Sequence, residues 1–240
     1  MSLYSDAPHP IREAIEVAHQ QELAEFTSDG TWWTGAERAA IVVEARRARA
    51  EAGFAKMDPV VDASGETAEI PDAARAVARV VAAKPMTMTR ELFDSALADG
   101  LKEEQYVETV SVAARTVNLD IFATALGVTP RALPSTHSGA PSRVRPSTAA
   151  DEGAWANTVP SSGRGGEEAL ALYGKAPAAN ILRAVSLVPA EATAAMRLGA
   201  AQYVGSDNFS NLAFTYDPGI TRPEVEYLAS RVSVLNDCFY

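Results

Sequence analysis

The chain has a single cysteine, Cys238, among its 240 residues, and only three histidines. One cysteine cannot form an intrachain disulfide, and so few Cys and His side chains cannot build a structural zinc site. We therefore expect neither a metal ion nor an organic cofactor. Because no disulfide framework points to an oxidising compartment, the reducing cytoplasm is the expected location.

Long apolar runs and an excess of basic residues are also lacking. No run of about 18 apolar residues is present, and residues 1–6 lack the basic and apolar regions of a secretory signal. The formal net charge is −10 and the pI is near 4.8, which disfavours nucleic acid and an anionic membrane as partners. With 47% hydrophobic and 22% charged residues, the composition is typical of a globular protein with a sizeable core.

Signals for helix starts and ends recur along the chain, whereas the alternation typical of strands is scarce. Thr34-Gly35-Ala36-Glu37 is a capping box, with a Thr N-cap and a Glu three residues later. Gly100 and Gly127 stand where helices typically end. We predict an all-α fold with helices over residues 10–26, 35–52, 71–84, 89–98, 102–117, 119–126, 167–173, 178–188, 189–203 and from 222 to the end of the chain.

The stretch from 129 to 166 has a different composition, with five prolines, five glycines and many Ser and Thr residues. Such a composition predicts an irregular connector. It separates a helical unit at 1–128 from a second helical unit at 167–240. Four connector arginines stand out in an acidic chain, and they suit either an anion site or an arm held to an acidic body; we favour the arm. They are Arg131, Arg143, Arg145 and Arg164.

The last predicted helix opens with a second capping box, Thr221-Arg222-Pro223-Glu224. Its apolar face keeps helical spacing to the end of the chain, through Val225, Leu228, Ala229, Val232, Leu235 and Phe239. Aligning the two boxes gives an offset of 187 residues, and Glu108 and Asn118 share the spacing of Glu226 and Asn236. This pattern favours a duplicated helical unit; a chance match between Ala-rich helices is the alternative.

The segment 222–240, RPEVEYLASRVSVLNDCFY, resembles the active-site helix of AhpD-like alkylhydroperoxidases, in the carboxymuconolactone decarboxylase superfamily. Residues 180–189 and 100–128 are also similar to family members, so the resemblance covers both helical units. The family signature is E-x11-C-x2-C-x3-H, in which Glu and His form a proton relay for a dithiol. The resemblance implies an AhpD-like helical bundle in a homo-oligomer. It also implies antioxidant peroxidase or disulfide reductase activity on a peroxide, with a thiol or peroxiredoxin-type electron partner.

Carried over to this chain, the signature assigns Glu226 as the relay glutamate and Cys238, twelve residues later, as the first redox cysteine. The second redox residue would be position 241 and the histidine position 245. The first repeat carries Glu51 and Phe54 at the corresponding positions, so it is expected to be catalytically empty. The chain as given therefore carries half of the implied site.

Three interpretations of Cys238 stay open. In the first, the chain belongs to a longer product with Cys at position 241, or with selenocysteine there from a UGA codon. In the second, the chain is a non-catalytic helical scaffold that binds a partner or supports an oligomer. In the third, Cys238 is a one-cysteine peroxidatic site that an external thiol must reset, because no resolving thiol is present.

Other candidates have simpler interpretations. His19 has Glu16 and Glu22 three residues to either side, but a carboxylate-bridged metal site needs a second set of ligands, so we predict a surface ion pair. Trp32-Trp33 precedes a helix cap and is interpreted as a hydrophobic staple and core cover. The charges at 44–51 are interpreted as a solvated helix face or an oligomer contact.

Overall fold

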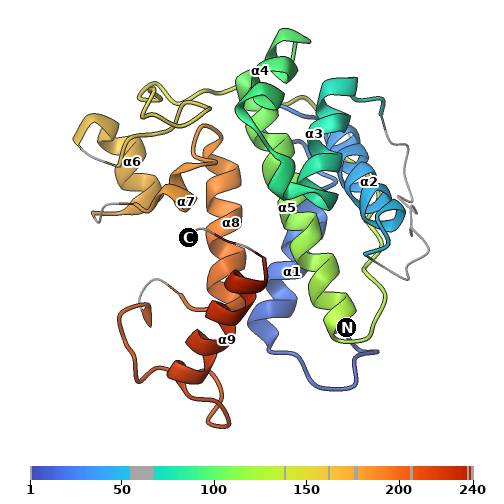
Figure 1. Cartoon of the computed structure of the whole chain (residues 1–240), viewed down its shortest axis with the longest axis vertical. Helices are drawn as coiled ribbons and strands as arrows, with labels where there is room; N and C mark the ends of the chain where they lie inside the picture. The colour runs from blue at the N-terminus through green and yellow to red at the C-terminus, as the bar shows by residue number, and fades with distance from the viewer. Residues whose placement is uncertain are drawn as a thin grey trace. The chain divides into compact units, whose positions relative to one another are not determined.

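The computed structural model describes residues 2–54, 68–137, 139–161, 163–175, 178–205, 208–236 and 238. Within them the secondary structure is helical, apart from isolated bridges such as the antiparallel one between Ala150 and Thr158. The chain divides into two compact units, Met1–Leu198 and Gly199–Tyr240 (Figure 1). The prediction of an all-α fold is confirmed.

The first helices begin and end close to the predicted positions. They are α1 (Glu13–Glu25), α2 (Gly35–Glu51) and α3 (Asp72–Ala83). The capping box of α2 is confirmed, because Thr34 Oγ1 accepts from Glu37 N–H at 3.3 Å and the Glu37 carboxylate accepts from Thr34 N–H at 2.8 Å. These two hydrogen bonds satisfy two of the backbone N–H groups that the start of a helix leaves without partners.

A short 3₁₀ turn η1 (Pro85–Thr87) leads to α4 (Arg90–Ala98), and α5 (Glu103–Ala125) follows. The predicted break in α5 near Asn118 is wrong, and one continuous helix covers both predicted ones. No Gly or Pro interrupts residues 103–126, so every backbone bond can form. The glycines that follow α4 and α5, Gly100 and Gly127, have φ of 94° and 75°, a conformation that L side chains rarely adopt.

Past the connector come η2 (Gly163–Gly165), α6 (Gly166–Tyr173), α7 (Asn180–Arg183) and α8 (Pro189–Gln202). The predicted helix over 178–188 is wrong in extent, because α7 has a single turn. Ser186 explains the early end: its hydroxyl donates to Arg183 O at 2.6 Å and accepts from Val159 N–H at 2.9 Å. The side chain thus turns the backbone toward the connector, as Ser commonly does outside helices.

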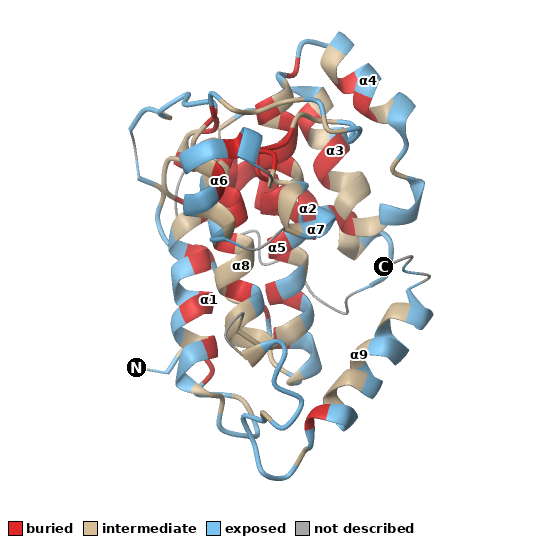
Figure 2. Cartoon of the chain, turned by 90° about the vertical axis from the view of Figure 1, so that its left-hand side faces the viewer, coloured by how far each residue is buried: buried red, intermediate tan, exposed pale blue. Residues whose placement is uncertain are grey.

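The core of the first unit lies where α2, α3 and α5 contact one another (Figure 2). Small and β-branched residues line the three contacting faces, which lets the helix axes approach closely. Fully buried members include Ala39, Ile41, Val42, Ala74, Val77, Ala78, Val112 and Ala113. Trp33 and Phe26 are the largest fully buried side chains, so the predicted role of the Trp pair as core cover is confirmed.

The second unit comprises the last turn of α8, a loop and α9 (Arg222–Leu235). The second capping box is confirmed, with Thr221 N–H and Oγ1 donating to Glu224 at 2.8 and 2.7 Å. The prediction that the helix continues to the end of the chain is wrong, because α9 ends at Leu235. The Asn236 side chain donates to Val232 O at 2.8 Å, a local bond that competes with helix continuation. Phe239 lies outside the described residues.

Candidate functional site

The predicted relay residue Glu226 lies in the second turn of α9. Its two carboxylate oxygens accept hydrogen bonds from Tyr203 OH and Arg222 Nε, each at 2.5 Å. The bond from Tyr203 and then that from Arg222 lower the pKa of Glu226, because both stabilise the charged form. Glu226 is therefore held as an ionised carboxylate in a fixed position.

Arg222 organises the second unit around this carboxylate. It is the buried residue of α9, and its guanidinium also donates to Asn208 O and Phe209 O at 3.3 Å each. Its Cζ lies 5.9 and 6.0 Å from the ring centroids of Tyr203 and Phe209, within the range of cation–π attraction. The loop before α9 is thus folded onto the start of the helix by one arginine.

The candidate redox residue Cys238 is exposed and follows α9. Its backbone N–H donates to Ser233 O at 2.9 Å, which fixes it beside the last turn of the helix. Ser233 lies seven positions after Glu226, a rise of about 10 Å along the helix axis. The structure therefore does not bring Glu226 and Cys238 into contact, and the roles assigned to them stay predictions.

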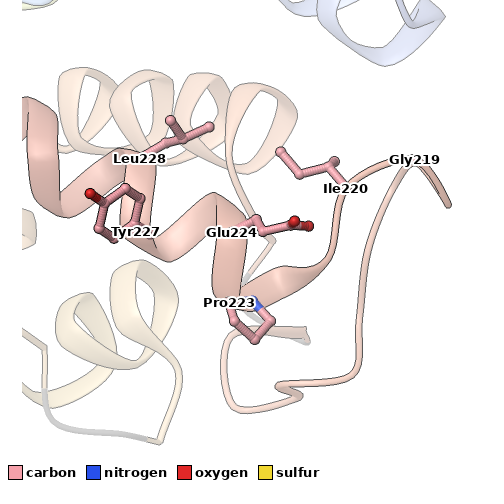
Figure 3. Close-up of a pocket in the computed structure, with 6 residues that line it drawn as sticks. All are labelled: Gly219, Ile220, Pro223, Glu224, Tyr227 and Leu228. Atoms are coloured by element: carbon pink, nitrogen blue, oxygen red, sulfur yellow. The ribbon is translucent and has the colours of Figure 1, made fainter.

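An open depression of about 510 Å³ lies at the start of α9. Figure 3 shows its labelled side chains projecting from the first turns of the helix and from the loop before it. The wall is mostly apolar with one carboxylate, and it is formed by Gly219, Ile220, Pro223, Glu224, Tyr227 and Leu228. Such a wall is suited to apolar contact.

The first unit contains a buried network of charged side chains that the sequence analysis missed. At its centre, the two oxygens of Glu191 in α8 accept from Arg38 Nη1 at 2.7 Å and from Arg115 Nη2 at 2.5 Å. Arg38 in α2 also binds Glu108 at 2.5 Å, and Arg115 in α5 also binds Glu22 in α1. All five side chains are at most 4% exposed. Four helices are therefore joined through one ionic cluster.

Further contacts complete the network at its edges. Trp32 N–H donates to Glu108 at 2.7 Å, and Arg197 binds Glu22 at 2.5 Å and Glu25 at 2.8 Å. Four carboxylates then face three guanidinium groups, so the ionised cluster would carry one excess negative charge. Burial of such an excess is costly, which favours retention of a proton by one of the carboxylates.

The pKa directions agree with this charge balance. Burial alone would raise the pKa of Glu191, but Arg115 and Arg38 lower it to about 2. Burial raises the pKa of Glu108 and also that of Glu22, against the opposing effect of their arginines. These carboxylates are enclosed and hydrogen-bonded, so their evident role is to hold α8 against α1, α2 and α5.

The prediction of a surface ion pair for His19 is wrong. His19 is fully buried, its Nδ1 lies 2.7 Å from Tyr4 OH, and its ring meets that of Phe122 edge-on at 4.7 Å. Burial lowers the pKa of His19 to about 4, because charging an enclosed imidazole is unfavourable. Its predicted partner Glu22 belongs instead to the buried network.

The interpretation of residues 44–51 as a solvated face is wrong for Glu44 and Arg46. Arg46 is buried and binds Asp120 in a bidentate pair at 2.9 and 2.8 Å. Glu44 is also buried, and Arg79 of α3 binds it at 3.3 Å. In contrast, Arg47 is exposed, as predicted. The charged side chains of α2 are therefore of two kinds, some buried in ion pairs and others exposed to solvent.

The prediction that the connector arginines hold the arm to an acidic body is confirmed for two of them, Arg131 and Arg145, whereas Arg164 pairs within the arm. Arg131 binds Asp6 of the N-terminal segment, Arg145 binds Glu103 and Glu104 of α5, and Arg164 binds Glu152 within the connector. The fourth, Arg143, lies over the Trp32 ring at 5.7 Å from the centroid. Exposed pairs of this kind contribute little to stability individually, so the arm depends on several of them together.

In the part of the chain that the structure describes, no group of three or more His, Cys, Asp or Glu residues is placed to hold a metal ion. Nor does that part include a helix with the length and apolar character needed to cross a membrane.

A sequence signal for the buried network exists, although it is incomplete. Glu108 and Arg115 lie seven residues apart on α5 and share a face with Val112, and His19 and Glu22 interrupt the apolar face of α1. A charged residue inside an apolar stripe indicates burial with a partner. The identity of that partner depends on which helices meet, and a single sequence does not contain that information.

Comparison of the chain with protein-family models, with curated proteins and with solved structures finds no match. The resemblance to AhpD-like proteins therefore rests only on the residues 222–240, 180–189 and 100–128.

Proposed function

We propose that the chain is an AhpD-like thiol oxidoreductase in which Cys238 reduces peroxides or the disulfides of a protein partner. The observation that supports the proposal is that one segment, α9 and the residues just after it, holds both Glu226 and Cys238. It presents an exposed cysteine beyond its last turn and an ionised glutamate, held by two hydrogen bonds, near its first. Glu226 and Cys238 have the spacing of the Glu and the first Cys of the AhpD-like signature. A cytoplasmic setting belongs to the proposal, because it would keep Cys238 as a thiol.

In the proposed reaction, the Cys238 thiolate attacks the peroxide and the O–O bond breaks, giving a sulfenic acid and an alcohol. An external thiol then attacks the sulfenic acid and releases water, leaving a mixed disulfide on Cys238. A second external thiol displaces Cys238 and forms the external disulfide. One peroxide and two thiols are thereby converted to one alcohol, one water and one disulfide.

In this proposal Glu226 is the proton acceptor that the resemblance implies for the Cys238 thiol, and about 10 Å of helix separates it from the turn that holds Cys238. Tyr203 OH and Arg222 favour its ionised form, which is the form that can accept a proton. Tyr203 and Arg222 are then positioning residues for the carboxylate.

Peroxide consumption with a small thiol as reductant tests the proposal. Replacing Cys238 with Ser should abolish turnover, and Glu226→Gln should slow it by about 10²-fold. Glu224→Gln is the matched control, because it lies on the same helix and Gln can still accept the Thr221 bonds. Equal rates for Cys238→Ser and the unaltered protein would exclude the proposed chemistry.

The second candidate is a non-catalytic helical protein that binds a partner or forms an oligomer. The exposed apolar side chains of α9, among them Leu228, Val232 and Leu235, favour it specifically. The same peroxide assay separates the two candidates, because this one predicts no dependence of turnover on Cys238.

A further inference from the structure

The helix α9 presents a continuous stripe of exposed residues along one side. Glu224, Leu228, Arg231 and Leu235 follow each other at intervals of four, three and four residues, which places them on one helix face. Leu228 and Leu235 are 55% and 73% exposed, and Tyr227 and Val232 beside the stripe are also exposed. Figure 2 shows α9 with mostly exposed residues after its buried start. An apolar face of this kind marks an interaction site.

The charges on the stripe are complementary to a reversed copy of the same stripe. Glu224 is an acid near the start of α9, and Arg231 is a base two turns later. Arg231 is exposed and forms no ion pair with the residues described here. Glu224 uses one oxygen for both Thr221 bonds, which leaves lone pairs of its carboxylate for a further donor. An antiparallel second helix places each Glu224 opposite the Arg231 of the other copy.

The apolar residues agree with the same register. When Glu224 faces Arg231, Leu228 of one copy meets Tyr227 of the other at the twofold axis. Leu235 of one copy then lies level with Ile220 of the other, which lines the open depression at the start of α9 (Figure 3). Each copy therefore supplies both the protruding side chains and the depression that receives them, as a twofold interface requires.

The overall charge of the chain favours a locally neutral surface as the meeting point for two copies. The chain carries a net charge of −10, so two copies repel each other overall on approach. Helix α9 has two acids and two arginines and is locally neutral. We propose that α9 pairs with α9 of a second copy of this chain in an antiparallel, twofold-symmetric dimer. The pairing does not depend on the chemistry of Cys238.

Light scattering on the full chain across a dilution series tests the association. The mass should rise with concentration from 25.4 kDa toward twice that value. Leu228→Glu and Leu235→Glu should each remove the rise, whereas Leu212→Glu should keep it, since Leu212 is equally exposed in the loop of the same unit. Arg231→Glu should weaken association and Arg231→Lys should preserve it. Helix content by circular dichroism verifies that each variant is folded.

Cysteine cross-linking in a Cys238→Ser background tests the register. Only residues near the twofold axis approach their own copies, so Leu228→Cys should form a disulfide-linked dimer and Leu235→Cys should not. Residue 235 would lie fifteen positions from its copy along the axis, about 22 Å, far beyond disulfide reach. Cross-linking of both would indicate parallel helices and overturn the proposal. A monomer at all concentrations, or a dimer that the α9 substitutions leave intact, would also overturn it.

Discussion

Replacing Glu191 with Gln tests the central role of the buried network in the first unit. The substitution keeps the size of the side chain but removes the charge that faces Arg38 at 2.7 Å and Arg115 at 2.5 Å. Breaking a buried ion pair costs about 3–5 kcal/mol. Because the Gln carbonyl can still accept one bond, and Glu108 and Glu22 partly compensate the arginines, we expect the lower end, about 3 kcal/mol.

Such a loss is a large share of the stability of a protein domain, which is about 5–15 kcal/mol in total. For a unit of this size it corresponds to a decrease in melting temperature of about 6–12 °C. Urea denaturation followed by tryptophan fluorescence measures it, since Trp32 and Trp33 are buried in the same unit. Glu167→Gln, an exposed change in α6, is the control and should stay within about 0.5 kcal/mol.

Two further measurements sharpen this prediction. In a double-mutant cycle with Arg115→Met, the combined loss should be smaller than the sum of the single losses. The pKa of Glu191 lies at about 2 in the folded chain, against an ordinary value of 4.5. Its contribution is therefore complete above pH 4.5 and is lost as pH falls toward 2, a loss that Glu191→Gln should not show. A cost below about 1 kcal/mol, or strict additivity in the cycle, would refute the network as the link between the helices.

Other predictions concern the same unit. Burial lowers the pKa of His19 from 6.5 to about 4. Up to about 3 kcal/mol of stability should therefore be lost as pH falls through this range. Denaturation at several pH values should show a weaker dependence of stability on pH for His19→Asn than for the unaltered protein. Glu108 has a raised pKa, so its contribution declines as pH rises from 4.5, and Glu108→Gln should cost less at neutral pH than Glu191→Gln does. Gly30→Ala should destabilise by about 1–3 kcal/mol, because a Cβ there would collide with Glu108 Oε1. At Gly199 in α8, an added Cβ would have no atom within 4 Å, so Gly199→Ala should leave the stability unchanged or increase it. The melting temperatures of Gly30→Ala and Gly199→Ala test this difference.

Much of the local structure was predictable from short-range rules. Both capping boxes form as expected, because the Thr and Glu involved are three residues apart and need no tertiary partner. The ends of α4 and α5 at Gly100 and Gly127 follow from the freedom of glycine at positive φ. Prediction went wrong at the continuous α5 and the single-turn α7. Helix α5 tolerates Asn118, and α7 is ended by Ser186, whose hydroxyl bonds Val159 N–H of the connector.

The sequence alone determined that the chain is helical and acidic with a stretch of different composition at 129–166, and that Cys238 and Glu226 share the C-terminal segment. These properties depend on composition, periodicity and spacing along one chain. Only the tertiary structure decided which charged residues are internal. Glu22, Glu108 and Glu191 are far apart in sequence, and burial with Arg38 and Arg115 requires four helices to meet. It also ended α9 at Leu235 and set the Cys238 N–H against Ser233 O, where residue spacing alone predicted a continuous helix.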